Sequence, residues 1–254
     1  MTIGAEVWGE GPPVVALHGW TMRGRIWEPV ARRLDATVHA PDLPGHGATT
    51  GYAPDIAGGV VLLGDYLAAH DLHDVTLVGW SLGALIGWAY LQGGSGRVAR
   101  MVSLDMSPRP LPAPGWDFAM RGQSADKAAQ GSARFLRDWP AAAQAIARSM
   151  VAQPETCTAL PAAESLIRAN DPAVMAAFWD SLTRADLRAA IARLPVPLLA
   201  IHGARSRIYP PQTADWLAAT APQGRALVLP GCGHSPNLED PQAVADALSA
   251  FIRA

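Results

Sequence analysis

The sequence predicts an α/β fold with a mostly parallel, twisted sheet flanked by helices. Short apolar runs of strand length alternate with helical patterns along the first part of the chain, and the same rhythm returns near its end. Strands separated by helices in this way form parallel sheets through right-handed βαβ crossovers. Half of the 254 residues are hydrophobic and 17% are charged, which supplies a sizeable buried core and argues against intrinsic disorder.

The first part of the chain alternates strands and helices. The expected strands are short apolar runs, and they cover Ala5–Trp8, Val14–Leu17, Thr37–Ala40, Val75–Val78 and Val98–Leu104. Turn residues such as Pro41 close them. The expected helices have apolar residues at helical spacing, and they cover Ile26–Leu34, Ile56–His70 and Ala84–Gln92.

The rhythm changes at Pro108, where a proline-rich stretch begins. The patterns that follow are helical only, and they cover Ala125–Trp139, Ala141–Val151, Ala162–Ala169 and Pro172–Leu182. The alternation then resumes with strands at Leu198–His202 and Ala226–Leu229 and with helices at Thr213–Ala219 and Pro241–Ile252. An interrupted parallel sheet predicts one core, residues 1–107 and 195–254, with a helical lid of residues 108–194 inserted after the strand that ends at Asp105.

The composition excludes several classes of function. A net charge of −2 offers no basic footprint for nucleic acid or an anionic membrane surface. Two cysteines, Cys157 and Cys232, cannot build a disulfide framework or a cysteine zinc site, and the histidines show no metal-ligand pattern, so we expect no metal and no cofactor. No apolar run reaches the roughly 18 residues of a membrane span, and the N-terminus lacks a signal-peptide pattern. We therefore expect a cytoplasmic protein.

The segment Gly79-Trp80-Ser81-Leu82-Gly83 is the strongest local signal for chemistry. A G-x-S-x-G between a strand and a helix forms a sharp turn, because its glycines let the backbone bend until the serine is exposed above the sheet. The N-terminus of the following helix then points its N–H groups at any negative charge that forms there. Ser81 is therefore the candidate nucleophile.

Two further candidates follow from the same chemistry. His234 lies after the last expected strand and before the last expected helix, where it can act as general base to Ser81. An oxyanion hole needs two N–H donors about 3 Å from the developing alkoxide. The N–H of Leu82, which follows the nucleophile, is one donor, and the N–H of Trp20, after an early strand, is the natural second.

Four motifs together carry a family resemblance. They are His18-Gly19-Trp20, Asp42-Leu43-Pro44-Gly45-His46-Gly47, Gly79-Trp80-Ser81-Leu82-Gly83 and Gly233-His234-Ser235-Pro236. In this order and spacing they resemble the α/β-hydrolase superfamily, whose fold would include the whole chain apart from the helical block. The first and third resemble most closely the carboxylesterases that cleave pimeloyl-[acyl-carrier protein] methyl ester in biotin synthesis. The resemblance implies a serine esterase, a small or carrier-bound acyl ester as substrate, and acyl carrier protein as the candidate partner.

The chain departs from the family pattern at the acid of the catalytic triad. The resemblance implies an aspartate after the penultimate strand, where this chain has Ser206. A serine cannot offset the charge that forms on the histidine during proton transfer. Asp105, at the end of the strand after the nucleophile strand, is well placed instead, so we hypothesise a triad of Ser81, His234 and Asp105. The alternative is that Asp105 only caps the entry to the lid. Asp42 is a poorer candidate because its motif serves loop structure.

The lid holds the candidate substrate-binding residues. Its aromatic side chains either line an acyl channel or form the core of the lid itself. With two residues of the catalytic loops, the candidates for the pocket are Trp80, His18, Trp116, Phe135, Trp139 and Trp179. The lid arginines Arg134, Arg137 and Arg148 are candidates for docking an acidic carrier protein, although basic and acidic residues nearly balance in the lid, which is also typical of an ordinary solvated surface.

Three functions fit these residues. The leading interpretation is a serine carboxylesterase. A second is another chemistry of the same fold, such as a C–C hydrolase, a perhydrolase or a lactonase. A third is a non-catalytic binding protein that has kept the pocket and lost turnover, which the serine at position 206 favours and the retained Ser81 and His234 disfavour.

Overall fold

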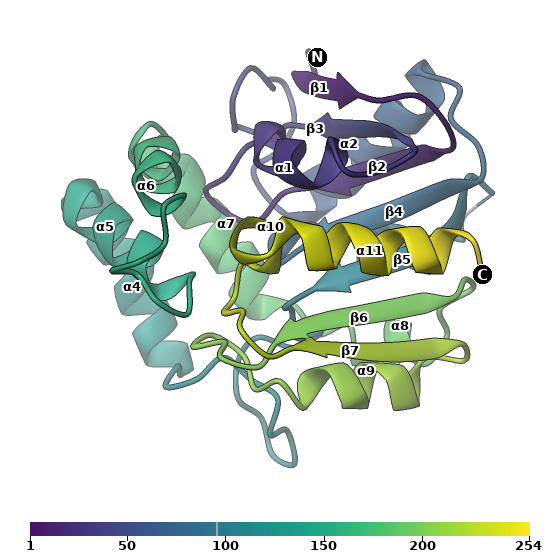
Figure 1. Cartoon of the computed structure of the whole chain (residues 1–254). Coiled ribbons are helices and arrows are strands. Elements are labelled where there is room, and N and C mark those ends of the chain that lie inside the picture. Colours follow the sequence, from purple (N-terminus) through teal and green to yellow (C-terminus); the bar gives the residue numbers. More distant parts are fainter. Residues whose placement is uncertain (95) are drawn as a thin grey trace.

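One sheet organises the chain in a computed structural model that describes residues 1–94 and 96–254. Its strands are β1 (Ala5–Trp8), β2 (Pro13–Leu17), β3 (Thr37–Pro41), β4 (Val75–Trp80), β5 (Val98–Leu104), β6 (Leu198–Gly203) and β7 (Gly224–Leu229). Within the described residues the sheet has seven strands in the order β1-β3-β2-β4-β5-β6-β7 (Figure 1). Among these seven strands, β1 alone runs antiparallel to its neighbour, at one edge. The expected strands are thus all present.

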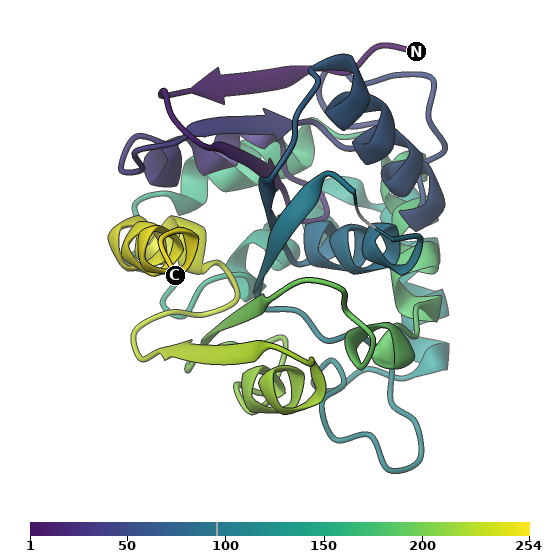
Figure 2. The same ribbon diagram turned by 90° about the vertical axis from the view of Figure 1, so that its right-hand side faces the viewer.

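Helices cover both faces of the sheet. They are the 3-10 helix η1 (Gly24–Trp27) and the α-helices α1 (Glu28–Ala31), α2 (Ile56–Ala69), α3 (Leu82–Gln92), α4 (Ala125–Arg137), α5 (Trp139–Ser149), α6 (Leu160–Arg168), α7 (Pro172–Arg184), α8 (Arg188–Ile191), α9 (Thr213–Thr220), α10 (Pro236–Glu239) and α11 (Pro241–Ile252). Helices α1 and α11 lie together on one face, and α2, α3 and α8 lie on the other, as the end-on view in Figure 2 shows.

Proline accounts for two of the differences between the expected helices and the structure. The helix expected at Ile26–Leu34 is divided into η1 and the short α1, which has Pro29 in its first turn. The helix expected at Ala125–Trp139 ends two residues earlier, because the side chain of Asp138 caps the next helix and Pro140 occupies the first turn of that helix. Proline lacks an N–H, so it fits a first turn and not a helix interior.

The register of the strands brings their carboxyl ends to one edge of the sheet. Leu17 of β2 lies beside Gly79 of β4, and Trp80 lies beside Leu104 of β5. Leu104 lies in turn beside Ile201 of β6. The residues that follow these strands therefore emerge next to one another, although they are far apart in the sequence. This edge is where ligands bind in open parallel sheets.

The segment between β5 and β6 is helical. We refer to residues 108–194 as the helical segment; α4, α5 and α6 lie beyond the carboxyl edge of the sheet, at the left of Figure 1. Helix α4 packs against α7, and α5 packs against α6. Its role as a lid, and the division of the chain into one core and an inserted lid, stay predictions.

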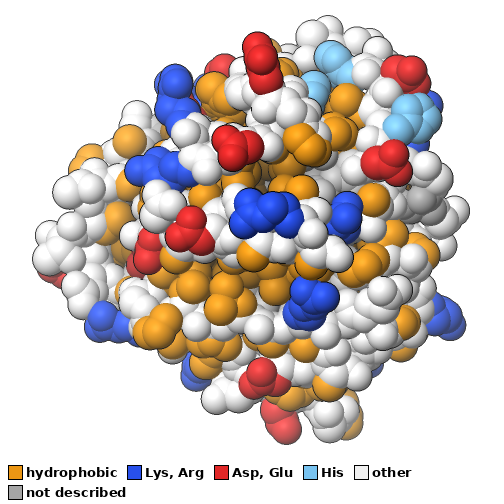
Figure 3. Space-filling model, turned by 45° about the vertical axis from the view of Figure 1, so that its right-hand side comes forward, with side chains coloured by type: hydrophobic (Ala, Val, Ile, Leu, Met, Phe, Trp, Pro, Cys, Tyr) orange, Lys and Arg blue, Asp and Glu red, His pale blue; other side chains and the backbone are white. Residues whose placement is uncertain are grey.

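Charges of both signs share the surface. On the face drawn in Figure 3, acidic and basic side chains are interspersed among apolar ones. In the part of the chain that the structure describes, no helix is both long enough and apolar enough to cross a membrane.

Candidate active site

Ser81 lies in the turn between β4 and α3 with a backbone φ of 52° and ψ of −117°. This conformation is costly for a residue with a side chain, and such strain is concentrated at functional sites. The glycines beside it are required by space. A Cβ at Gly79 would lie 2.5 Å from the backbone of Gly83, and one at Gly83 would lie 2.4 Å from the carbonyl oxygen of Leu17. The turn thus has the geometry that the sequence predicts.

Asp105 takes the equivalent position on the neighbouring strand. It follows β5, also has a positive φ, of 41°, and is fully buried. The strand pairing continues to these two residues, since the Ser81 N–H donates to the carbonyl of Leu104 at 3.0 Å and the Asp105 N–H donates to the carbonyl of Ile201 at 2.8 Å. Both side chains are therefore held by the backbone of the sheet.

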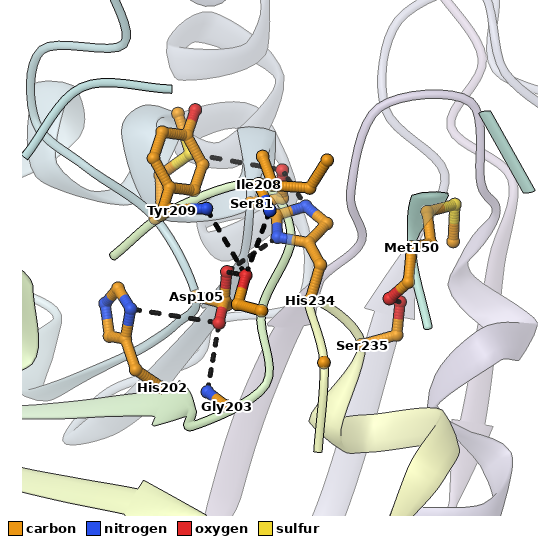
Figure 4. Close-up of polar contacts among 12 residues, drawn as sticks. Ser81, Asp105, Met150, His202, Gly203, Ile208, Tyr209, His234 and Ser235 are labelled. Atoms are coloured by element: carbon orange, nitrogen blue, oxygen red, sulfur yellow. Dashed lines mark hydrogen bonds and ion pairs between the residues drawn. The ribbon is translucent and has the colours of Figure 1, made fainter. Parts of the chain in front are cut away.

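His234 joins the two side chains (Figure 4). Its Nδ1 lies 2.8 Å from Asp105 Oδ1, and its Nε2 lies 3.1 Å from Ser81 Oγ. Because a carboxylate only accepts, Nδ1 carries the proton, which leaves Nε2 free to accept from the serine hydroxyl. The three residues form one chain of hydrogen bonds that ends on a buried carboxylate.

Polar contacts keep the Asp105 carboxylate ionised. Burial alone would raise its pKa, but the hydrogen bond from His234, the neighbouring imidazoles of His202 and His234, and the Gly203 N–H at 3.0 Å together outweigh burial and lower the pKa of Asp105 below its usual value. On the other side, Nδ1 of His202 lies 3.8 Å from Oδ2. His202 is fully buried, and burial lowers the pKa of its imidazole, which favours the neutral form.

Ser206 supports this carboxylate. Its hydroxyl donates to Asp105 Oδ1 at 2.8 Å, the same oxygen that accepts from His234. The Ser206 oxygen accepts in turn from the N–H groups of Ile208 and Tyr209, each at 3.3 Å. The position where the family resemblance implies an acid thus holds a hydroxyl that donates to the carboxylate of Asp105, at the end of the neighbouring strand β5.

The candidate oxyanion donors are the N–H groups of Leu82 and Trp20. Leu82 is the first residue of α3, so its N–H has no acceptor within the helix. Trp20 follows Gly19, which packs so closely on the ring of Trp80 that a Cβ at Gly19 would lie 3.1 Å from it. The indole N–H of Trp20 donates to the carbonyl of Met175 in α7 at 3.0 Å, so this loop is fixed to the helical segment.

A cavity of about 480 Å³ opens above Ser81, and we call it the Ser81 cavity. Sheet-end loops and the helical segment both contribute to its wall, which is lined by Gly19, Trp20, Trp80, Ser81, Met120, Gln123, Lys127, Gln130, Gly131, Arg134, Phe135, Ala142, Ala145, Ile146, Ser149, Met150, Trp179, Leu182, Ile208, Tyr209 and His234. Its size and mostly apolar lining are typical of a small-molecule site. Of the pocket residues expected from the sequence, it includes Trp80, Phe135 and Trp179.

The structure places the other three expected pocket residues elsewhere. Trp116 packs edge-on against Trp216 of α9, and its indole N–H donates to the carbonyl of Arg109. Trp139 is buried behind Phe135, edge to face at 6.0 Å.

His18 is a structural link between two loops. Its Nε2 accepts from the Leu43 N–H at 2.9 Å, and its Nδ1 lies 2.8 Å from the carbonyl oxygen of Gly19. Full burial lowers the pKa of His18 to about 4. Asp42 also holds loops together, since its carboxylate accepts from the N–H groups of Gly24 and Ala48.

The candidate docking arginines differ in their surroundings. Arg134 lines the Ser81 cavity together with Lys127, which sequence reasoning missed. Arg137 is exposed at the end of α4, and Arg148 on α5 pairs with Glu155 at 2.5 Å. Only one of the three is therefore part of the cavity wall.

Comparison with known proteins identifies the family of the chain. The model of the Alpha/beta hydrolase family matches residues 14–247, which is most of the chain. The chain belongs to this family. A relative from Chromobacterium violaceum named "Pimeloyl-[acyl-carrier protein] methyl ester esterase" is 31% identical and covers 99% of this chain and 98% of its own. A protein of the same name from Nitrosomonas europaea is 28% identical over 98% of this chain and 99% of its own.

A solved structure agrees on the fold. The esterase EaEST from Exiguobacterium antarcticum has a TM-score of 0.92 and covers 99% of this chain and 96% of its own, at 20% identity. Family and fold neighbour confirm the fold class and the family resemblance that the motifs indicate, and the named relatives support the expectation of a hydrolytic enzyme of the esterase type.

Groups outside the hydrogen-bonded chain were less visible in the sequence. Met106 Sδ lies 4.0 Å from the Ser81 hydroxyl, and the ring of Tyr209 packs on that of His234. Cys157 and Cys232 are free thiols. Within residues 1–94 and 96–254, no three His, Cys, Asp or Glu side chains are grouped as ligands for a metal ion.

Proposed function

We propose that this alpha/beta hydrolase is a serine carboxylesterase that works through Ser81, His234 and Asp105. The observation that carries the proposal is the continuous hydrogen-bond chain from the serine hydroxyl through both ring nitrogens of His234 to a buried carboxylate. A base that is oriented by a third group is what activates a serine hydroxyl.

The chemistry proceeds by acyl transfer. Ser81 Oγ attacks the ester carbonyl while Nε2 of His234 takes its proton, and the N–H groups of Trp20 and Leu82 stabilise the oxyanion. Asp105 balances the imidazolium charge. The tetrahedral intermediate then expels the alcohol, which receives the proton from His234, and leaves an acyl group on Ser81. Water repeats the sequence on the acyl-enzyme, with His234 as base, and releases the carboxylic acid and the free serine.

The preferred substrate in this proposal is pimeloyl-[acyl-carrier protein] methyl ester. The relatives from Chromobacterium violaceum and Nitrosomonas europaea are named for hydrolysis of this ester. The apolar wall of the Ser81 cavity suits the hydrocarbon part of such an acyl chain. The helical segment would act as a lid, and Arg134, Arg137 and Arg148 on it would contact the acidic carrier protein.

Hydrolysis of p-nitrophenyl esters across a series of acyl lengths tests the esterase activity. We expect turnover by the purified protein and its loss in Ser81→Ala, because only the hydroxyl can form the acyl-enzyme. The same series separates an enzyme from a binding protein, and C–C hydrolase, perhydrolase and lactonase activities are each measured with their own substrates. If the wild type binds the esters without hydrolysing them, the result would support the alternative that the chain is a non-catalytic binding protein.

Growth of a biotin auxotroph tests the identity of the substrate. A biotin auxotroph that lacks its pimeloyl esterase should grow without biotin when it expresses this chain, and should not grow with Ser81→Ala. Absence of growth with well-expressed, esterase-active protein would exclude the role in biotin synthesis and leave the esterase activity standing.

A further inference from the structure

The loop that carries His234 is tied down by contacts on both sides of the histidine. Glu239, in the short helix α10 that follows, accepts from the N–H of Gly233 at 2.8 Å and from the N–H of Ser235 at 3.3 Å, both on Oε2. The indole of Trp80, the residue before the nucleophile, donates to the carbonyl of His234 at 2.7 Å. The backbone on each side of the base is thus fixed by hydrogen bonds.

The second oxygen of Glu239 reaches into the helical segment. Oε1 accepts from the N–H of Ala152, just beyond α5, at 2.6 Å. Beside it the Ser235 hydroxyl donates to the carbonyl of Met150 at 3.0 Å, a contact drawn in Figure 4. The two segments pack without a gap, since a Cβ on Gly233 would lie 2.5 Å from the Ala152 nitrogen.

The end of α5 is also a wall of the Ser81 cavity, to which Ser149 and Met150 contribute. We propose that Glu239 is a positioning residue that joins this wall to the His234 loop through its two carboxylate oxygens, so that the cavity wall and the general base keep one fixed relation. The proposal rests on the proposed function, because it assigns Glu239 to the positioning of its base.

The chemistry of the contacts requires a carboxylate. Three N–H groups converge on Glu239, and an ionised carboxylate offers acceptors on both oxygens, whereas an amide has a single oxygen and an NH₂ that would face one of the donors. Burial raises the pKa of Glu239, and the three N–H donors oppose this by favouring the charged form.

Glu239→Gln tests the bridge first without any substrate. Hydrogen exchange followed by NMR should show the amide of Ala152, Gly233 or Ser235 exchanging about tenfold faster than in the wild type, because at least one loses its acceptor. The proton on Nδ1 of His234 should shift in the same variant, since the ring moves relative to Asp105. This readout does not depend on turnover.

Kinetics then test the consequence for the base. In Glu239→Gln we expect kcat for p-nitrophenyl acetate to fall about ten- to hundredfold, since small misplacements of a reacting group have effects of this size. KM should change less than kcat, because Glu239 does not line the Ser81 cavity. The matched control is Glu164→Gln, which removes a carboxylate paired with Arg168 on α6 and should leave both the exchange and the rate unchanged.

A second variant tests the same link with Glu239 intact. Gly233→Ala inserts a methyl group between the loop and Ala152, and we expect it to lower kcat in the same direction while the protein remains folded by circular dichroism. Unchanged exchange in Glu239→Gln, or unchanged kcat in both variants, would overturn the proposal. If the wild type shows no esterase activity but the amides still exchange faster in Glu239→Gln, the proposed function is overturned. The bridge formed by Glu239 would then still stand.

Discussion

At the carboxyl edge of the sheet, Ser81 and Asp105 are held in positive-φ backbone and in a network of short polar contacts. Across the Ser81 cavity the helical segment presents Phe135, Ile146 and Trp179, which are apolar side chains carried by three different helices. The first region fixes atoms through directional bonds to the backbone. The second fills space through contacts that have little direction.

This difference assigns catalysis to the sheet edge and the choice of acyl group to the helical segment. Hydrogen bonds and backbone strain can hold a reacting atom within the fraction of an ångström that catalysis requires. Apolar packing tolerates changes of shape at modest cost, and so it can set which acyl group fits. Changes at the sheet edge should therefore act on kcat or on folding, and changes in the helical segment should act on KM and on acyl length.

The largest effect is expected at the acid. Asp105→Asn keeps the shape of the site but removes the charge that balances the imidazolium, and we expect kcat to fall about 10⁴-fold, as in other triads that lose this carboxylate. Ser206→Ala removes only one donor to the same carboxylate and should lower kcat about tenfold. Steady-state kinetics on p-nitrophenyl butyrate measure both. Near-normal kcat in Asp105→Asn together with inactive Ser206→Ala would show that the acid is not Asp105.

The next effect concerns stability at the sheet edge as a function of pH. The buried rings of His18 and His46 lie 4.9 Å apart, and burial lowers their pKa values to about 4 and about 3. The unfolded chain takes up protons below about pH 6.5 and the folded chain does not, so the free energy of unfolding should fall by roughly 2 kcal/mol per histidine between pH 6.5 and pH 5.

Urea unfolding at several pH values measures this slope. His46→Asn should reduce the slope, whatever its effect on stability at neutral pH. If the wild type and His46→Asn had the same slope, the pH dependence of stability could not be assigned to His46.

In the helical segment, Ile146 tests the selection of acyl length. Ile146→Ala removes part of the cavity wall, and we expect KM for a p-nitrophenyl octanoate to rise roughly three- to tenfold through lost apolar contact, with kcat unchanged. The acetate should not respond. Leu136→Ala is the matched control, because Leu136 is 61% exposed on α4 and is not part of the cavity wall. An equal change for both esters would mean that Ile146 acts on the fold and not on selection.

The smallest effect is expected from charge at the cavity. Arg134→Ala should raise KM for a carrier-linked ester about two- to fivefold, because exposed charges act weakly and through a screened field. It should leave the p-nitrophenyl esters unchanged. Arg168→Ala, on α6, serves as the control. A KM for the carrier-linked ester that does not depend on Arg134 or on salt would argue against docking at this position.

The two regions also differ in how far the sequence predicted them. Ser81, His234 and Asp105 come from strand ends, and once the chain alternates strands with helices the topology alone brings those ends to one edge. Phe135 and Trp179 could be predicted only as aromatic residues of a helical block. Which of their faces meets the cavity depends on how α4 rotates against α7, and no local pattern specifies that rotation.

Two residues show what could not be predicted from the sequence. Trp116 lies in a loop without periodic pattern, and its partner is Trp216, which sequence reasoning had no means to select. Glu239 lies five residues after His234, and yet its role depends on Ala152, which is 87 residues away. A contact of that range becomes visible only when the packing of the helical segment is known.

The anchoring of the Trp20 loop has a consequence for exchange of parts between relatives. The Trp20 indole donates to the carbonyl of Met175, and the Asn170 amide donates to the carbonyl of Thr21 at 2.7 Å. A helical block transplanted from another hydrolase would have to offer an acceptor and a donor at these same two points, or the transplanted enzyme would lose its oxyanion donor along with its old specificity. The Trp20 loop and the helical segment are separate along the chain, but their contacts make each depend on the other.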